Sequence, residues 1–122
     1  MKSERIDKQF DLVLVALDPA VGSEQRGTRQ CVVLQTNGFE GGRTVLVAPL
    51  TTKKLERIYT NEVEIGLEDG VGIKEPSKMK TEQIKVIDKK RIKKHLGSLH
   101  PHMHKKIRDA VEIIFDLKGF YA

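Results

Sequence analysis

The 122-residue sequence contains one cysteine, no tryptophan and only four prolines. A single cysteine excludes an internal disulfide, and Cys31 lies in an apolar segment, as expected for a buried thiol. The longest uncharged apolar runs fall far short of the roughly 20 residues that a membrane span requires. The N-terminus also lacks the apolar core of a secretory signal. These absences predict a cytoplasmic protein that is not bound to a membrane and has no disulfides.

The composition is that of an ordinary globular protein with a local excess of positive charge. Hydrophobic residues make up 39% and charged residues 32%, which predicts one domain over residues 1–122. Residues 1–9 are charged and non-periodic, so we expect a loose N-terminal arm. The net charge is +5, and the segment 74–94 carries nine of the basic residues. Such a segment suits a polyanion such as nucleic acid, or else forms a solvated surface.

The expected strands come before the expected helices. Apolar, β-branched runs predict strands over residues 11–17, 31–35 and 43–49. Alternating segments predict an edge strand over residues 62–65 and one or two strands over 77–87. A helical turn is expected near residues 55–59 and a turn at 69–72, where Gly70 and Gly72 lie. Because strands and helices do not alternate, a parallel sheet is disfavoured and a small antiparallel barrel or curled sheet is expected.

From Asp88 onward the pattern predicts two helices. Asp88 can cap a short helix over residues 89–96, which Gly97 would end. A second helix is expected from about Pro101, because proline is tolerated at the first helical position. Its apolar stripe consists of Met103, Ile107, Ala110, Val111, Ile114 and Leu117. The fold class predicted is therefore α+β, mainly β, with a C-terminal helix.

No cofactor or metal site is expected. His100, His102 and His104 lie close together, but their spacing is not that of a zinc site, and a solvated helix start is the expected role. The sequence has no phosphate-binding GKS/T motif, no GxSxG elbow and no carboxylate cluster suited to magnesium. An enzyme with this sequence would be expected to work without a metal.

The segment between the first two strands carries the densest set of reactive side chains. Ser23 and Arg26 lie there between Gly22 and Gly27, which admit positive φ, and Arg29 follows two residues after Gly27. RNA can be cleaved by its own 2′-hydroxyl if the protein stabilises charge on the phosphate and holds the attack in line. Guanidinium groups suit that charge, and the hydroxyls of Thr51 and Thr52 can add hydrogen bonds. The alternative role for either arginine is a structural salt bridge.

Three segments resemble the MazF/PemK/Kid toxins of toxin–antitoxin systems. They are LDPAVGSEQRGTRQCVVLQ (17–35), VAPLTTK (47–53) and EQIKVIDKKRI (82–92). The resemblance implies a small SH3-like barrel of the CcdB/PemK type with a C-terminal helix, and a homodimer. It also implies metal-independent, sequence-selective cleavage of single-stranded RNA, leaving 2′,3′-cyclic phosphate and 5′-hydroxyl ends. A cognate antitoxin would inhibit the toxin by placing its tail in the RNA groove.

The resemblance also implies roles for individual residues. Arg29 falls on the motif arginine and Thr51 on the threonine after the third strand, and these two are the expected catalytic pair. Glu82 takes the place of a proposed catalytic aspartate of the Kid branch, so it is the candidate base, and its alternative role is to pair with a neighbouring lysine. The residues expected to contact RNA are Ser23, Glu24, Arg26, Thr52, Lys53, Lys80 and Gln83.

Three positions depart from the family pattern. Gln30 replaces the proline that usually follows the motif arginine, Phe10 replaces a glycine, and Ser23 replaces the histidine of the Kid branch. These departures leave open a weakened member of the family. The rival hypothesis is a non-catalytic protein with the same fold, either a CcdB-like gyrase inhibitor or a degenerate module that binds RNA or antitoxin.

Overall fold

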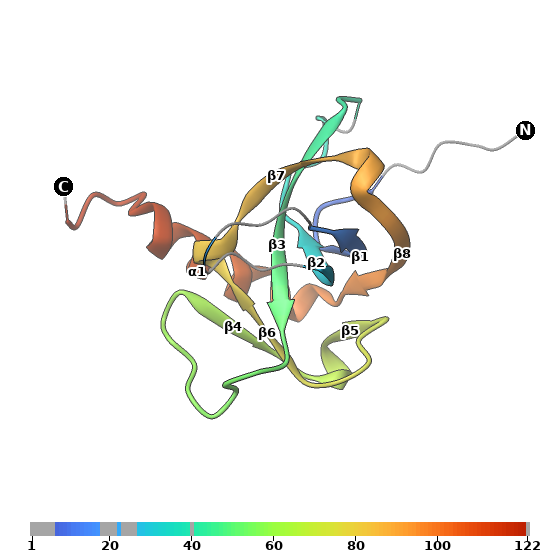
Figure 1. Ribbon diagram of the computed structural model, residues 1–122. Coiled ribbons are helices and arrows are strands. Elements are labelled where there is room, and N and C mark those ends of the chain that lie inside the picture. Colours follow the sequence, from blue (N-terminus) through green and yellow to red (C-terminus); the bar gives the residue numbers. More distant parts are fainter. Residues whose placement is uncertain (1–6, 18–21, 23–26, 40, 122) are drawn as a thin grey trace, which may run out of the picture.

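The structure is a computed structural model that describes residues 7–17, 22, 27–39 and 41–121. A curled antiparallel sheet forms its body, and a helix follows at the C-terminal end (Figure 1). The order of the paired strands is β4-β6-β3-β2-β1-β8-β5, and β7 pairs with β3. The strands are β1 Asp11–Ala16, β2 Thr28–Val33, β3 Thr44–Thr51, β4 Glu62–Ile65, β5 Gly70–Val71, β6 Ser77–Lys80, β7 Lys85–Asp88 and β8 Ile92–Leu99. The predicted mainly-β barrel with a C-terminal helix is confirmed.

Short 3₁₀ helices connect several strands. They are η1 Leu67–Asp69, η2 Thr81–Gln83, η3 Lys89–Arg91 and η4 Pro101–Met103, and the α-helix is α1 His104–Phe115. The segment predicted as one or two strands over 77–87 is therefore two strands, β6 and β7, separated by η2. Within the part of the chain that the structure describes, no helix is long and apolar enough to cross a membrane.

β1 is an interior strand of the sheet, between β2 and β8, and buries side chains on both faces. Leu12 packs into one hydrophobic cluster, together with residues of β3, β6 and α1. Val13 and Val15 pack into a second cluster on the opposite face, with Cys31 and Val47. This explains why β1 is a continuous apolar run and does not alternate, since a strand buried on both faces gains from apolar residues at every position.

The helix predicted over residues 89–96 is wrong. The Asp88 carboxylate does accept a hydrogen bond from Lys90 N at 2.8 Å, but only the single turn η3 follows, and Ile92 begins β8. β8 pairs with β1 along its length. Backbone groups at the open edge of β1 need partners, and pairing there outweighs the weak local helix signal. Gly97 is part of this strand and does not end a helix.

Gly97 is required by the close approach of β5 to β8. Its φ is 158°, and a Cβ at this position would lie 1.9 Å from Val71 O. Gly70 and Gly72 flank Val71 and face β8 in the same way, with Cβ positions 2.6 Å from Ser98 O and 2.3 Å from Leu96 O. The turn predicted at 69–72 is therefore partly wrong, because β5 occupies its two middle residues.

The C-terminal helix begins as predicted but buries only part of its stripe. Met103, Ile107 and Ala110 are buried, whereas Ile114 and Leu117 are 41% and 69% exposed. The helix ends at Asp116, whose φ is 51°, so it stops short of Leu117. Figure 1 shows the second half of α1 leaving the sheet, which explains the exposed apolar side chains there.

Phe10 lies at a position where the resemblance implies a glycine, and its backbone adopts a conformation that glycine takes without strain. Its φ is 73°, in the left-handed region that costs other residues roughly 1–2 kcal/mol. The side chain offsets this cost by packing, because it is only 4% exposed and stacks on the His104 ring at 3.9 Å. The Arg108 guanidinium lies 5.1 Å from the same ring. Phe10 thus holds α1 against the sheet.

Two further predictions need correction. Residues 55–59 contain no helix. The N-terminal arm was predicted over residues 1–9, of which 1–6 lie outside the described residues. Gln9 is held in place, because its backbone N–H donates to Asn37 Oδ1 at 2.9 Å and its side chain donates to Leu34 O at 2.8 Å. The described end of the arm therefore belongs to the folded body.

Candidate active site

The two ends of the segment that joins β1 to β2 are hydrogen-bonded to each other. Leu17 N donates to Gly27 O at 2.9 Å, which closes the loop at its base. Gly22 and Gly27 have φ values of 60° and 76°, so both adopt the backbone conformation that glycine was expected to provide. Three of the residues expected to contact RNA, Ser23, Glu24 and Arg26, lie outside the described residues.

Arg29 and Thr51 lie on the same face of the sheet, at the ends of neighbouring strands. β2 and β3 are antiparallel, and Cys31 pairs with Pro49. This pairing is the end of the β2–β3 ladder, and Arg29 and Thr51 each lie two residues beyond it along their strands. Because side chains two residues apart share a face, both extend the face that carries Cys31. The strand register therefore supports the expected juxtaposition of the two predicted catalytic residues.

Thr51 is held in an orientation that suits a hydrogen-bond donor. It is 7% exposed, and its Oγ1 accepts a hydrogen bond from Lys53 N at 3.2 Å. A hydroxyl has one proton to donate besides the lone pairs that accept. The Thr51 hydroxyl can therefore donate that proton to a phosphate oxygen. Thr52 and Lys53, both expected to contact RNA, follow directly and are exposed.

Two cations flank the Cys31 thiol on this face. Burial raises the pKa of Cys31 to about 12, while the positive charges of Lys85 and Arg29 act in the opposite direction. Lys85 pairs with Val47 on β3, so it lies on the side of β3 away from Arg29. The sequence analysis missed Lys85 as a site residue. Lys85 is two residues from Ile87 on β7, and Ile87 is buried on this face. This spacing could have indicated that Lys85 faces the same side of the sheet.

The environment of Cys31 predicts an unreactive thiol. The raised pKa keeps the thiol protonated throughout the neutral range, and thiolate is the reactive form. We expect iodoacetamide at pH 8 to leave native Cys31 unmodified and to modify it fully in denaturant, as measured by mass spectrometry. Rapid modification of the native protein would show that the thiol is accessible.

The second part of the candidate site is η2, which joins β6 to β7. β6 pairs with Thr51 and β7 with Val47, so η2 lies beside the stretch of β3 between them. It carries Glu82 and Gln83, and it is a 3₁₀ turn where a strand was expected. Since neighbouring strands are about 4.8 Å apart, η2 is roughly 10 Å across the sheet from β2 and Arg29.

Glu82 pairs with a neighbouring lysine, which was the alternative to its predicted role as the base. Lys80 Nζ lies 3.6 Å from Glu82 Oε2, and Asn61 Nδ2 donates to Glu82 Oε1 at 3.1 Å. The Glu82 side chain remains 41% exposed, so the carboxylate is both held and open to solvent. Lys80 was expected to contact RNA, and its described contact is this carboxylate. Asn61 was not foreseen, because it comes from a distant segment of the chain.

Lys78 fixes the segment that follows Thr51. Its side chain is 4% exposed, and Nζ donates to Glu62 Oε1 at 2.9 Å. It also donates to the backbone oxygens of Lys54 and Arg57, both at 3.0 Å. Lys78 is thus a buried charge whose three described partners all come from residues 54–62. Because Lys78 pairs with Thr51 across β6 and β3, its ammonium group holds the backbone next to the candidate site.

Three side chains could hold a metal ion among the residues that the structure describes. They are Asp7, Asp11 and His95, and His95 Nε2 already lies 3.1 Å from Asp11 Oδ2. Asp11 is four residues from Val15, the partner of Arg29 on β1, which corresponds to about 14 Å along a strand. This group is therefore separate from the Arg29 face.

The three C-terminal histidines have separate contacts. His102 Nε2 lies 2.8 Å from Asp69 Oδ1, and His104 stacks on Phe10. The His100 and His102 rings lie 6.0 Å apart in a tilted arrangement. The predicted solvated helix start is therefore only partly right, because these rings also contact one another, Asp69 and Phe10.

The comparison with known proteins identifies the family. A family model described as "PemK-like, MazF-like toxin of type II toxin-antitoxin system" matches residues 8–115. The chain belongs to this family. The predicted resemblance to MazF and PemK toxins is therefore confirmed.

Relatives of known function support an endoribonuclease. The chain is 33% identical to endoribonuclease EndoA of Bacillus subtilis, over 94% of this chain and 99% of that protein. It is 32% identical to endoribonuclease MazF of Staphylococcus saprophyticus, over 90% of this chain and 92% of that protein.

Solved structures show the same fold. The structure matches MazF of Deinococcus radiodurans with a TM-score of 0.77 at 17% identity, covering 93% of this chain and 99% of that one. It also matches a mycobacterial endoribonuclease in complex with its cognate antitoxin, with a TM-score of 0.75 at 18% identity, covering 91% and 96%. This likeness extends along most of the chain.

Proposed function

We propose that this MazF-like toxin cleaves single-stranded RNA at specific sequences, without a metal, by attack of the RNA's own 2′-hydroxyl. The observation that supports the proposal is the pairing of Cys31 with Pro49 on neighbouring strands, since Arg29 and Thr51 each lie two residues from this pair. A guanidinium and a hydroxyl supply hydrogen-bond donors for the phosphate, and neither requires a metal.

Each residue has a distinct role in the proposed reaction. Arg29 stabilises the charge that develops on the non-bridging oxygens and donates the proton to the leaving 5′-oxygen. Thr51 donates a hydrogen bond that orients the phosphate, and Lys85 adds positive charge to the same face. Glu82 is the proposed base for the 2′-hydroxyl, because its carboxylate is exposed while Lys80 and Asn61 hold it. Glu82 takes the proton of the 2′-hydroxyl, and the 5′-oxygen receives one from Arg29. The products are a 2′,3′-cyclic phosphate and a 5′-hydroxyl.

The same proposal covers the wider setting of the toxin. We infer that residues 1–122 act as one domain in the cytoplasm, form a homodimer and are inhibited by a cognate antitoxin. The family match and the relatives' endoribonuclease activity support this setting. The proposed RNA contacts are Ser23, Glu24, Arg26, Thr52, Lys53, Lys80 and Gln83.

The test is cleavage of a mixed-sequence single-stranded RNA by the purified protein in EDTA. We expect discrete fragments whose 5′ ends accept phosphate from polynucleotide kinase without prior dephosphorylation. Their 3′ ends should block ligation until the cyclic phosphate is removed. Intact RNA across varied sequences would contradict the proposal, and gyrase inhibition without RNA cleavage would favour the CcdB-like alternative. Primer extension on the fragments would identify the sequence that is cut.

A further inference from the structure

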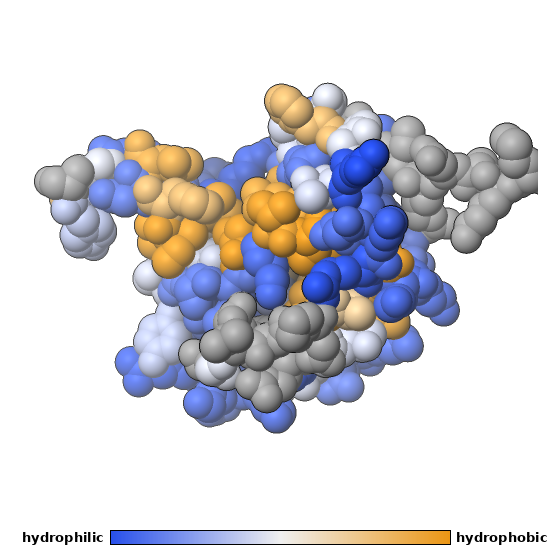
Figure 2. All heavy atoms as spheres, turned by 45° about the horizontal axis from the view of Figure 1, so that its top comes forward, coloured by the Kyte–Doolittle hydropathy of each residue, from blue (hydrophilic) through white to orange (hydrophobic). Residues whose placement is uncertain are grey.

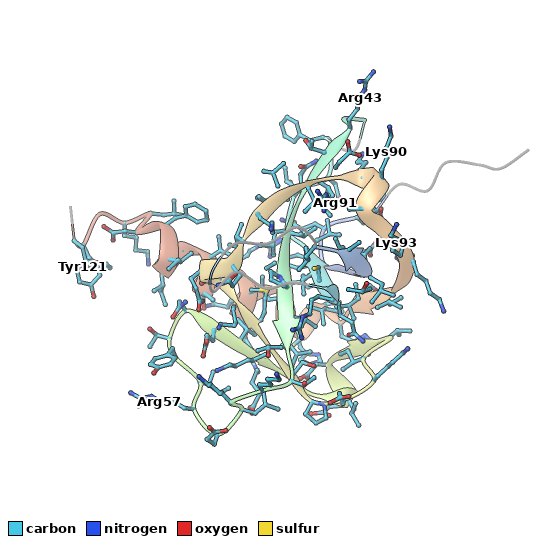
Figure 3. The ribbon with its side chains drawn as sticks, in the orientation of Figure 1. Arg43, Arg57, Lys90, Arg91, Lys93 and Tyr121 are labelled. Carbon is cyan, nitrogen blue, oxygen red and sulfur yellow. The ribbon has the colours of Figure 1, made fainter. Side chains whose placement is uncertain are left out.

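Basic side chains gather at one end of the molecule, where η3 leads into β8. Figure 3 shows Arg43, Lys90, Arg91 and Lys93 grouped there, and Arg57 at the opposite end. We call these four residues the basic ridge. Arg43, Lys90 and Lys93 are exposed and Arg91 is half-buried. Figure 2 shows a group of strongly hydrophilic residues on one side of a hydrophobic area on this part of the surface.

Hydrogen bonds attach the backbone of the basic ridge to the sheet. Lys89 N donates to Arg43 O at 2.9 Å, which joins η3 to the start of β3. Arg91 Nη1 donates to Ala16 O at 3.2 Å, which joins η3 to the end of β1. The cations are therefore mounted on a fixed backbone, so less ordering is needed when they bind a ligand.

The strand register brings the basic ridge close to Arg29. Val15 on β1 pairs with Arg29 on one side and with Ile92 on the other. Two strand spacings amount to about 10 Å, so Ile92 lies roughly that far from Arg29. Arg91 and Lys93 flank Ile92 in the chain. An RNA strand with one phosphate at Arg29 that continues across β1 would therefore come first to Arg91 and Lys93. Arg43 lies further along, where its backbone oxygen accepts from Lys89 N.

We propose that the basic ridge binds the phosphodiester backbone of the RNA on one side of the phosphate at Arg29. This inference rests on the proposed function. Lysine is a flexible point charge suited to phosphate, and phosphate contacts position a strand without reading its sequence. Within residues 7–17, 22, 27–39 and 41–121, no ion pair engages the side chains of Arg43, Lys90 or Lys93. These three cations are therefore available to phosphates.

The salt dependence of RNA binding tests the proposal. The RNA contains the mapped cleavage sequence with a 2′-deoxy nucleotide at the cleaved position, which removes the attacking hydroxyl. For single strands, each neutralised phosphate contributes about 0.7 to the slope of log K against log salt concentration. We expect the triple variant Arg43→Gln/Lys90→Gln/Lys93→Gln to reduce the steepness of that slope by about 2. The loss of affinity should be larger for a long RNA than for one that ends near the cleaved phosphate.

A matched control removes the same charge elsewhere. The variant Lys105→Gln/Lys106→Gln/Lys118→Gln changes three lysines in and just after α1, which lies across the molecule from η3 (Figure 1). We expect its slope to equal that of the wild type. An equal reduction in both variants would assign the effect to net charge and overturn the proposal.

The remaining outcomes separate this inference from the proposed function. A wild-type protein that neither binds nor cuts RNA would contradict the proposed function itself. A wild-type protein that cuts RNA, with an unchanged slope in the basic-ridge variant, would overturn only the inference about the ridge. If that variant instead lost affinity for a polyglutamate peptide, the ridge would be assigned to an acidic protein segment.

Discussion

Replacing Arg29 with alanine is expected to abolish RNA cleavage, with a fall in kcat of at least about 10³. Removing one hydrogen-bond donor from a charge-stabilising site costs roughly 10²–10³, and Arg29 is also the proposed acid. Initial rates on a short RNA that contains the mapped cleavage sequence would measure the loss. Wild-type rates in this variant would exclude Arg29 from catalysis.

Two further variants separate charge from geometry at Arg29. Arg29→Lys keeps the positive charge but loses the planar pair of N–H donors, so we expect activity between the wild type and Arg29→Ala. Lys105→Ala is the control for loss of a positive charge, because Lys105 lies on α1 and its side chain is 85% exposed. Its cleavage rate should match the wild type. Equal activity of Arg29→Lys and the wild type would show that charge alone is sufficient.

Replacing Lys78 with methionine is expected to lower the free energy of unfolding by about 3–5 kcal/mol. Removing one partner of a buried ion pair leaves the other charge buried without compensation, which produces losses of about this size. Here the change also leaves two backbone oxygens, those of Lys54 and Arg57, without their described donor. Urea unfolding followed by circular dichroism would measure the effect. An unfolding free energy equal to that of the wild type would contradict it.

A second substitution tests whether the buried pair is the cause. The double variant Lys78→Met/Glu62→Leu removes both charges, and we expect it to recover part of the loss. Lys105→Met is a control, because the Lys105–Asp109 pair is exposed, with 85% and 54% of the two side chains accessible. It should unfold near the wild-type urea concentration, since exposed pairs contribute little.

The same pair predicts how stability depends on pH. Burial raises the pKa of Glu62, but hydrogen bonds from Tyr59 N and Lys78 outweigh it and hold the pKa below its ordinary value of 4.5. A carboxyl with a lowered folded pKa stabilises the protein above its unfolded pKa, and this contribution is lost as pH falls through the folded pKa. We expect the wild type to lose part of its advantage over the double variant in acid.

Much of the fold was predictable because its central strands are apolar enough to be recognised alone. β1, β2 and β3 were expected close to where they occur, since Leu12, Val13 and Val15 must be buried in any arrangement. The segment 89–96 was mispredicted because Asp88 carries a genuine cap and Gly97 a plausible stop. Only the open edge of β1, which is a tertiary feature, makes this segment a strand.

Some residues of the candidate site could likewise be identified from the sequence, and others only from the structure. Arg29, Thr51 and Glu82 were identified from motifs, because reactive side chains of those types in those segments resemble a known family. Lys85, Lys78 and Asn61 were missed, since a lysine or asparagine has no local signal that tells a site or buried position from a solvated one. Lys85 acts on Cys31, Lys78 pairs with Glu62, and Asn61 donates to Glu82. Each of these partners is distant in the chain.

The sequence by itself determined the strands of the core, the C-terminal helix, the family and the two residues expected to carry the chemistry. The tertiary structure alone decided that Cys31 pairs with Pro49, that Lys78 is buried, and that Ile92, next to Arg91 and Lys93, lies two strands from Arg29. The physical reason is that hydrophobic periodicity and motifs are properties of neighbouring residues. Strand register and ion pairing join residues that are far apart in the chain.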